Sequence, residues 1–161
     1  MLSHHHRRVY LGLLVVLLWA CLAGPASPAG DNSRNIKDFG GDVPVQSVQA
    51  LAVDDFNAQV QQAVGHGEAW VKEPVLVALR FVGAEIRGHT KIIELRTPPE
   101  NQDSATVTVT EAGYPDDAVA GARWRLWLAK DTQGIWTLQK ALWAQLCSRP
   151  GQRFYSAGPC P

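Results

Sequence analysis

The feature that most constrains the fold is a C-terminal stretch, Gly121 to Cys160, with the pattern of two strands joined by a turn. Residues 123–130 alternate with period two, and this alternation together with their aromatic content indicates a half-buried strand. One side of that strand is entirely apolar: Trp124, Leu126 and Leu128. Residues 131–134 (DTQG) follow, and Asp and Gly both favour turns. The stretch therefore predicts an antiparallel hairpin.

The return strand of this hairpin allows two arrangements. In the first, every second residue faces inward and Lys140 interrupts the apolar face: Trp136, Leu138, Leu142, Ala144 and Leu146. In the second, a β-bulge near Lys140 brings Ala141 and Trp143 inward instead. The sequence does not choose between them. In either case the simplest role of the tryptophans is core packing and cross-strand pairing.

The chain closes with two cysteines, Cys147 and Cys160, which enclose the polar loop SRPGQRFYSAGP. A disulfide closing so short a loop stabilises a fold by about 3 kcal/mol, mainly by restricting the unfolded chain. A metal site is disfavoured because the stretch has no C-x-x-C spacing and no nearby histidine. We therefore predict a disulfide that folds the tail back onto the last strand.

Residues 1–29 carry the features of a secretory signal peptide. A charged start with Arg7 and Arg8 precedes an uncharged apolar run over residues 11–19, and small residues follow. The apolar run is too short to favour a transmembrane span. We therefore predict an exported protein that is periplasmic, membrane-anchored or extracellular. Such compartments are oxidising and permit the predicted disulfide.

The form of the signal stays open. Residues 18–21 (LWAC) resemble the box of bacterial lipoproteins, in which case Cys21 is lipidated and tethers the mature N-terminus to a membrane. Cleavage after Ala23 or Ala29 would instead remove Cys21. Residues 6–11 also resemble part of a twin-arginine signal, which would imply folding before export.

The remaining chain predicts a flexible linker over residues 30–47 and a single domain over residues 48–161. The linker is rich in Asp, Asn, Ser and Gly and shows no periodicity. Charge is uneven: residues 31–119 carry seven Lys/Arg and fourteen Asp/Glu (−7), whereas residues 120–161 carry six Lys/Arg and one Asp (+5). We expect the basic charges to face the acidic section or water. We expect no nucleic-acid partner, because an exported protein rarely meets DNA.

Apolar spacing in the middle of the chain predicts helices followed by strands. A first helix begins at residue 54 and stops at the glycines of residues 65–67, and a second spans residues 74–87 with proline at its first position. Strands over residues 90–97 and 105–111 precede the hairpin. This order predicts an α+β domain, with two N-terminal helices packed on a four-stranded antiparallel sheet.

Residues 123–142, RWRLWLAKDTQGIWTLQKAL, preceded by a helical section, resemble the cystatin-like, nuclear-transport-factor-2-like superfold. In that fold the last hairpin often has a glycine turn and a Trp opening the final strand, as in Gly134-Ile135-Trp136. The two-cysteine ending also resembles uncharacterised exported bacterial proteins. The resemblance covers residues 54–160 and implies a sheet curved around a pocket. Members range from isomerases to inert scaffolds, so it fixes no activity.

The sequence holds no motif for nucleophilic catalysis, phosphate binding, zinc or calcium. We therefore expect no catalytic residue, no metal and no cofactor. The best candidate binding patch is Arg149, Arg153, Phe154 and Tyr155, because arginines and aromatics on a short stapled loop can form a recognition surface. The competing interpretation is that the two aromatics anchor the tail while the arginines are solvated.

These observations favour a non-catalytic domain, exported or lipid-anchored, that binds a small ligand or an envelope protein. The alternative is a small exported enzyme that uses a pocket in the curved sheet. The enzyme requires ionisable side chains converging inside a concavity, whereas an apolar-filled sheet face argues against it.

Overall fold

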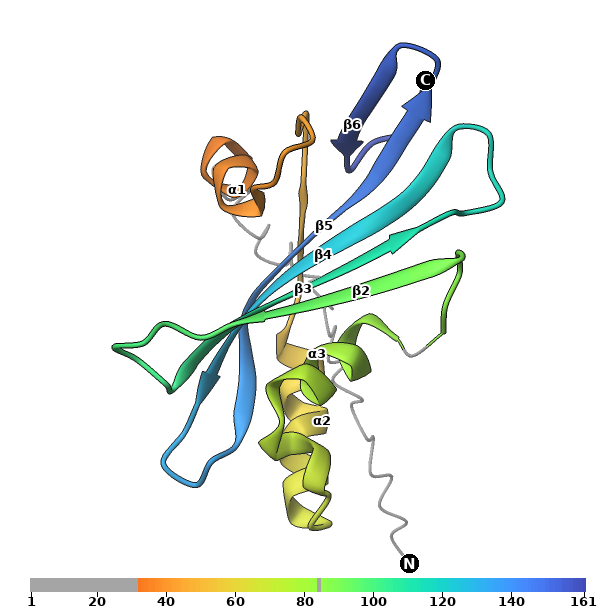
Figure 1. The fold of residues 1–161 in the computed structure, drawn as a ribbon. Coiled ribbons are helices and arrows are strands. Elements are labelled where there is room, and N and C mark those ends of the chain that lie inside the picture. Colours follow the sequence, from red (N-terminus) through yellow and green to blue (C-terminus); the bar gives the residue numbers. More distant parts are fainter. Residues whose placement is uncertain (1–31, 84) are drawn as a thin grey trace, which may run out of the picture.

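The computed structural model describes residues 32–83 and 85–161, so the predicted signal peptide and Cys21 lie outside the described residues. The described chain is an α+β fold, as predicted, but with more elements than expected (Figure 1). In chain order these are α1 (Asn32–Phe39), β1 (Gln49–Leu51), α2 (Asp54–Gly65), the 3-10 helix η1 (Ala69–Lys72), α3 (Pro74–Val82), β2 (Thr90–Arg96), β3 (Ser104–Ala112), β4 (Val119–Lys130), β5 (Trp136–Arg149) and β6 (Gln152–Ser156). Three α-helices and six strands thus replace the two helices and four strands of the prediction.

All the strands form one antiparallel sheet in the order β1-β5-β4-β3-β2, and β6 pairs with the far end of β5. The predicted hairpin of β4 and β5 is confirmed, and these two long strands form the centre of a twisted open sheet (Figure 1). Its turn is held by Asp131, whose Oδ1 accepts hydrogen bonds from the backbone N–H of Gln133 (2.8 Å) and Ile135 (2.9 Å). Gly134 takes the positive φ of 81° that the turn requires.

A β-bulge in β5 settles the question left open around Lys140. Trp127 pairs with Lys140, whereas the next residue of β4 pairs with Leu138, so Gln139 is the extra residue. Ala141 therefore turns inward beside Leu138, as the bulged arrangement predicts. The bulge also places three later residues of β5 in a second core on the other side of the sheet: Leu142, Ala144 and Leu146. This end of β5 is consequently buried on both faces.

The first face of the sheet is covered by α2, η1 and α3 and is filled with apolar side chains. Its centre is the packing of α3 onto alternate residues of β3 and β4: Val77, Ala78, Val107, Val109, Leu126 and Leu128. We call it the helix-covered face. Helix α3 ends at Val82 and not at residue 87 as predicted, because Gly83 adopts a φ of 96° and leaves the helical conformation.

The second face carries the arginines of β4 and is partly covered by α1 and the chain that follows it; we call it the arginine face (Figure 1). This corrects the expectation of a flexible linker over residues 30–47. Phe39 is 1% exposed and packs edge-on against Tyr155, with ring centroids 5.4 Å apart. The backbone of Pro44 and Gln46 also hydrogen-bonds to Tyr155 on β6 (2.8 and 2.9 Å). The apolar face made by β5 and β6 orders this segment, and its own sequence pattern does not reveal that.

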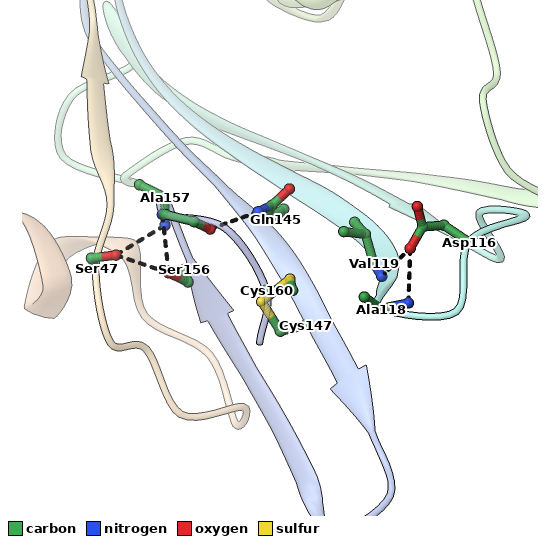
Figure 2. The surroundings of a disulfide bond; sticks show 10 residues. Ser47, Asp116, Ala118, Val119, Gln145, Cys147, Ser156, Ala157 and Cys160 are labelled. Carbon is green, nitrogen blue, oxygen red and sulfur yellow. Dashed lines mark hydrogen bonds between the residues drawn. A yellow bond between two sulfur atoms is a disulfide. The ribbon is translucent and has the colours of Figure 1, made fainter.

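The predicted disulfide between Cys147 and Cys160 is present and joins β5 to the chain end (Figure 2). The strand β6, which was not predicted, lies between the two cysteines and pairs with β5. Beyond it, Gln145 donates from its side chain to the carbonyl oxygen of Gly158 at 2.6 Å. The tail is therefore folded back as a staple, as expected.

Across residues 32–83 and 85–161, no helix has both the length and the apolar content needed to cross a membrane.

Candidate functional site

A cavity of about 380 Å³ opens on the arginine face, between residues 39–42 and the strands β2, β3 and β4. Its polar lining consists of three arginines, two carboxylates and a threonine: Arg96, Arg123, Arg125, Asp42, Glu94 and Thr108. Five charged side chains thus surround one cavity. We call it the arginine cavity.

Strand register explains why these side chains meet. Arg123 and Arg125 are two residues apart on β4, so both point to the same face. Thr108 on β3 pairs with Arg125 on one side and with Glu94 on the other. Because the threonine side chain is shorter than its charged neighbours, it leaves space between them and forms the floor of the cavity. Arg96, the last residue of β2, completes the rim.

Two consecutive glycines form the opposite wall, where the chain leaves α1. Gly40 and Gly41 have φ values of 58° and 110°, a region that favours glycine. A Cβ on Gly40 would lie 2.7 Å from Nη1 of Arg125, and one on Gly41 would collide with Nη1 of Arg123. The glycines therefore let the backbone approach both guanidinium groups. Arg123 donates to the carbonyl oxygen of Gly40 (3.2 Å), and Arg125 to that of Phe39 (3.1 Å).

Aromatic rings hold the same cations from the side. The guanidinium carbon of Arg123 lies 4.7 Å from the ring centroid of Tyr155, and that of Arg125 lies 5.5 Å from the centroid of Trp127. Arg123 also donates from Nε to the hydroxyl of Thr110 at 3.2 Å. These contacts fix the orientation of the arginines, which reduces the entropy lost when they bind a partner.

Electrostatics distinguish Arg125 from an ordinary surface arginine. Burial lowers its pKa, and the neighbouring cations Arg96 and Arg123 lower it further, against Asp38 and Glu94. Its Nε is buried and has no hydrogen-bond partner among the described residues. A guanidinium stays protonated in proteins despite such shifts, so the site holds several positive charges with donors to spare. This arrangement suits an oxyanion.

Two basic side chains of the C-terminal section, Lys130 and Lys140, face acidic partners from the earlier section. Lys140 Nζ lies 2.7 Å from the carboxylate of Asp38 on α1, and Lys130 Nζ lies 3.0 Å from that of Asp103. The bond between Lys140 and Asp38 also ties α1 to β5 beside the arginine cavity.

The predicted patch on the stapled tail is only partly brought together. Arg153 and Phe154 line a shallow depression of about 630 Å³ together with Pro44 and Gln46. Tyr155 is buried beneath Arg123, and burial raises the pKa of its hydroxyl. Arg149 is exposed at the end of β5 and does not line that depression.

A second ionisable cluster is buried at the place where β2 begins and β3 ends. Lys91 Nζ lies 3.0 Å from Glu111 Oε1, and the hydroxyl of Tyr114 donates to Glu111 Oε2 at 2.5 Å. Burial, followed by the bond to Glu111, raises the pKa of Tyr114 well above its ordinary value. Lys91 also donates to the carbonyl oxygens of Gly83 (3.2 Å) and Glu85 (2.8 Å). The cluster thus ties the connection after α3 to the sheet.

Within the described ranges, no group of three or more His, Cys, Asp or Glu side chains is placed to hold a metal ion. Sequence reasoning placed Arg123 and Arg125 on the outward face of their strand and the two glycines in a linker. A cavity between them was not predicted. The available signal was a pair of arginines two residues apart beside Trp127, a pattern that marks a charged sheet face but does not identify what covers it.

Comparison of the chain with protein-family models, with curated proteins and with solved structures finds no match.

Proposed function

We propose that this protein is an exported, non-catalytic binding domain that takes a small oxyanion, a carboxylate or a phosphate, in the arginine cavity. The observation that carries the proposal is the convergence of Arg96, Arg123 and Arg125 on one cavity. With Asp42 and Glu94 counted, the lining keeps a net positive charge.

The chemistry of the lining favours an oxyanion. Guanidinium groups present paired donors that match carboxylate and phosphate oxygens, and such charge-assisted bonds are stronger than neutral ones. An anion would also relieve the repulsion between neighbouring cations. A cavity of about 380 Å³ lies near the lower end of ligand sites in general, so the ligand is small.

Binding is favoured over catalysis for a physical reason. The ionisable groups that dominate this cavity are arginines, which remain protonated and therefore do not exchange protons with a substrate near neutral pH. The helix-covered face is filled with apolar side chains. The predicted superfold implies a pocket in the sheet, and the arginine cavity lies on the face opposite α2 and α3, beside α1.

Export rests on two observations that agree. Residues 1–29 have the composition of a secretory signal, and the disulfide between Cys147 and Cys160 is of a kind that persists in oxidising compartments. Lipidation at Cys21 would add a membrane tether, and mass spectrometry of the mature N-terminus distinguishes it from cleavage after Ala23 or Ala29.

The test is calorimetric titration and thermal unfolding of the purified protein with inorganic phosphate, acetate and succinate, with chloride at equal ionic strength as the reference. We expect saturable binding of at least one oxyanion and a stabilisation of about 2.7 kcal/mol at a hundredfold excess over Kd. Arg96→Gln and Arg125→Met should each weaken binding by about tenfold or more, since each removes a charge-assisted bond.

Arg149→Gln is the matched control, because it removes an exposed arginine outside the cavity. It should leave binding unchanged. Equal responses of all three variants, or no saturable binding beyond that of chloride, would refute the proposal.

A further inference from the structure

The β2 strand forms an open edge of the sheet. Among the described residues it pairs only with β3, whereas the opposite edge is formed by the short strands β1 and β6, which both pair with β5. Strands at an edge carry unpaired backbone donors and acceptors, which makes them templates for pairing with another chain. The two edges of this sheet are therefore unequal, and among residues 32–83 and 85–161 only the β2 edge offers a long free strand.

The direction of the free backbone groups follows from hydrogen bonds further into the sheet. Gly113 N–H donates to the carbonyl oxygen of Ala120, and Lys130 N–H to that of Asp103, both at 2.8 Å. Odd-numbered residues of β3 therefore face β4, and even-numbered ones face β2. The even-numbered residues of β3 are paired with even-numbered residues of β2, so these residues of β2 direct their backbone groups toward β3. The odd-numbered residues of β2 thus direct their backbone groups away from the sheet: Lys91, Ile93 and Leu95.

Side chains on this edge are unusually apolar for a surface. Within the described ranges the large exposed hydrophobic residues all fall in one stretch of the chain, on α3, on the connection after it and on β2: Leu76, Ile86, Ile92, Ile93 and Leu95. Ile93 is 39% exposed and Leu95 is 47% exposed. Scattered apolar residues are normal on a surface, but a concentration along one free strand marks an interaction site.

Two of the usual devices that protect an edge, a bulge and a proline, are missing from β2 itself. The strand pairs with β3 in unbroken register and contains neither a bulge nor a proline. Its lysine does not guard the edge, because the Lys91 ammonium is turned into the buried pair with Glu111.

We propose that β2 pairs antiparallel with β2 of a second copy, across a two-fold axis centred on Leu95. A closed two-fold contact is self-complementary, so each residue must suit its own symmetry partner. In this register Leu95 meets Leu95, and Glu94 of each copy lies opposite Arg96 of the other. Within one chain these two side chains form an ion pair at 4.0 Å and remain largely exposed, so they can exchange it for a pair across the axis. The centre on Leu95 also places Leu95 in a hydrogen-bonded pair with Leu95 of the other copy, and Ile93 in one with Thr97. Lys91 would face Pro99, which has no N–H, so the ladder covers residues 93–97.

Sedimentation velocity and native mass spectrometry of the purified protein test the proposal. Both report mass without any ligand, so they separate dimer formation from oxyanion binding even though Glu94 and Arg96 also line the arginine cavity. We expect a concentration-dependent species with twice the mass of one chain. Ile93→Pro removes an outward N–H without touching the ladder to β3, so the variant should fold and remain monomeric. Glu94→Arg places a second cation opposite Arg96 of the other copy and should raise the dissociation constant of the dimer at least tenfold. The double variant Glu94→Arg, Arg96→Glu should restore it.

Leu76→Lys serves as the control, because it removes an equally exposed apolar residue from α3 and should leave the dimer intact. If Ile93→Pro fails to fold, the charge-reversal pair carries the test alone. A protein that stays monomeric up to its solubility limit overturns the inference. The inference is also overturned if a dimer forms equally well in Ile93→Pro and in Glu94→Arg, or if the protein forms larger assemblies without a dimer.

Discussion

Replacing Lys91 with methionine removes the cation of a buried ion pair while keeping most of the side-chain length. The Lys91 and Glu111 side chains are 9% and 2% exposed, and their charged atoms are 3.0 Å apart. Removing one partner of such a pair costs about 3–5 kcal/mol, because the remaining charge is left uncompensated. Tyr114 still donates to Glu111, which favours the lower end of that range. The lost bonds to Gly83 and Glu85 add about 0.5–1 kcal/mol each. We expect a total loss of about 4 kcal/mol.

Equilibrium urea unfolding followed by tryptophan fluorescence measures this loss. With a slope of about 2 kcal/mol/M, the midpoint should fall by about 2 M while the slope stays constant. The double variant Lys91→Met, Glu111→Gln should recover most of the stability, because no charge is then buried and the amide oxygen can still accept from Tyr114. The exposed Lys72→Met is the control and should change stability by no more than about 0.5 kcal/mol.

Two results would refute this reasoning. A loss of less than about 1 kcal/mol for Lys91→Met would mean that water reaches Glu111 and stabilises its charge. A double variant no more stable than the single one would mean that the methionine acts by disturbing packing, and not by leaving a carboxylate unpaired.

Two further predictions concern the junction between α1 and the sheet. Gly41→Ala should lower stability and weaken oxyanion binding, because the new Cβ would collide with Nη1 of Arg123. The control is Gly151→Ala, since Gly151 has a φ of 77° and no atom lies within 4 Å of the added Cβ. This variant should cost only the backbone strain of about 1 kcal/mol and leave binding intact. Equal binding by the two variants would contradict the assigned wall of the cavity. The hydrogen bond from Lys140 lowers the pKa of Asp38 below its ordinary value of 3.8, so the carboxylate stabilises the folded state above that pH, and the contribution disappears as pH falls through the lowered value. Asp38→Asn should therefore cost less than about 1 kcal/mol near neutral pH and progressively less below pH 3.8, by urea midpoints; a pH-independent difference would count against the ion pair.

The parts of the fold that were predicted are those whose signal is local. Period-two alternation in residues 123–130 and the turn at Asp131 are readable within a dozen residues, and the structure confirms both. The helix α1 and strands β1 and β6 were missed because their order comes from distant partners. Phe39 is a lone apolar residue in a polar segment, and only the ring of Tyr155 across the sheet shows why it is buried.

The arginine cavity was not predicted because its contacts also join residues that are far apart in the sequence. The bond from Arg123 to Gly40 spans 83 residues of sequence, and that from Arg125 to Phe39 spans 86. Composition indicated a basic C-terminal section and an acidic earlier one, and the pairing of Lys140 with Asp38 confirms that the two meet. It could not indicate that a glycine pair would close over two of the arginines.

The bulge at Gln139 connects these observations. Without it, strict alternation would put Lys140 on the helix-covered face, in line with Trp136 and Leu138, where its ammonium would be desolvated. The extra residue moves Lys140 to the other face, over the ring of Trp127 and within reach of Asp38. The same shift turns the following apolar residues of β5 onto that face, where they become the surface that binds α1. The bulge in β5 thus supplies, together with Tyr155 of β6, the surface on which α1 docks, and the docking of α1 brings the glycine pair over the arginines. The cavity is therefore linked, through the docking of α1, to how the hairpin accommodates Lys140.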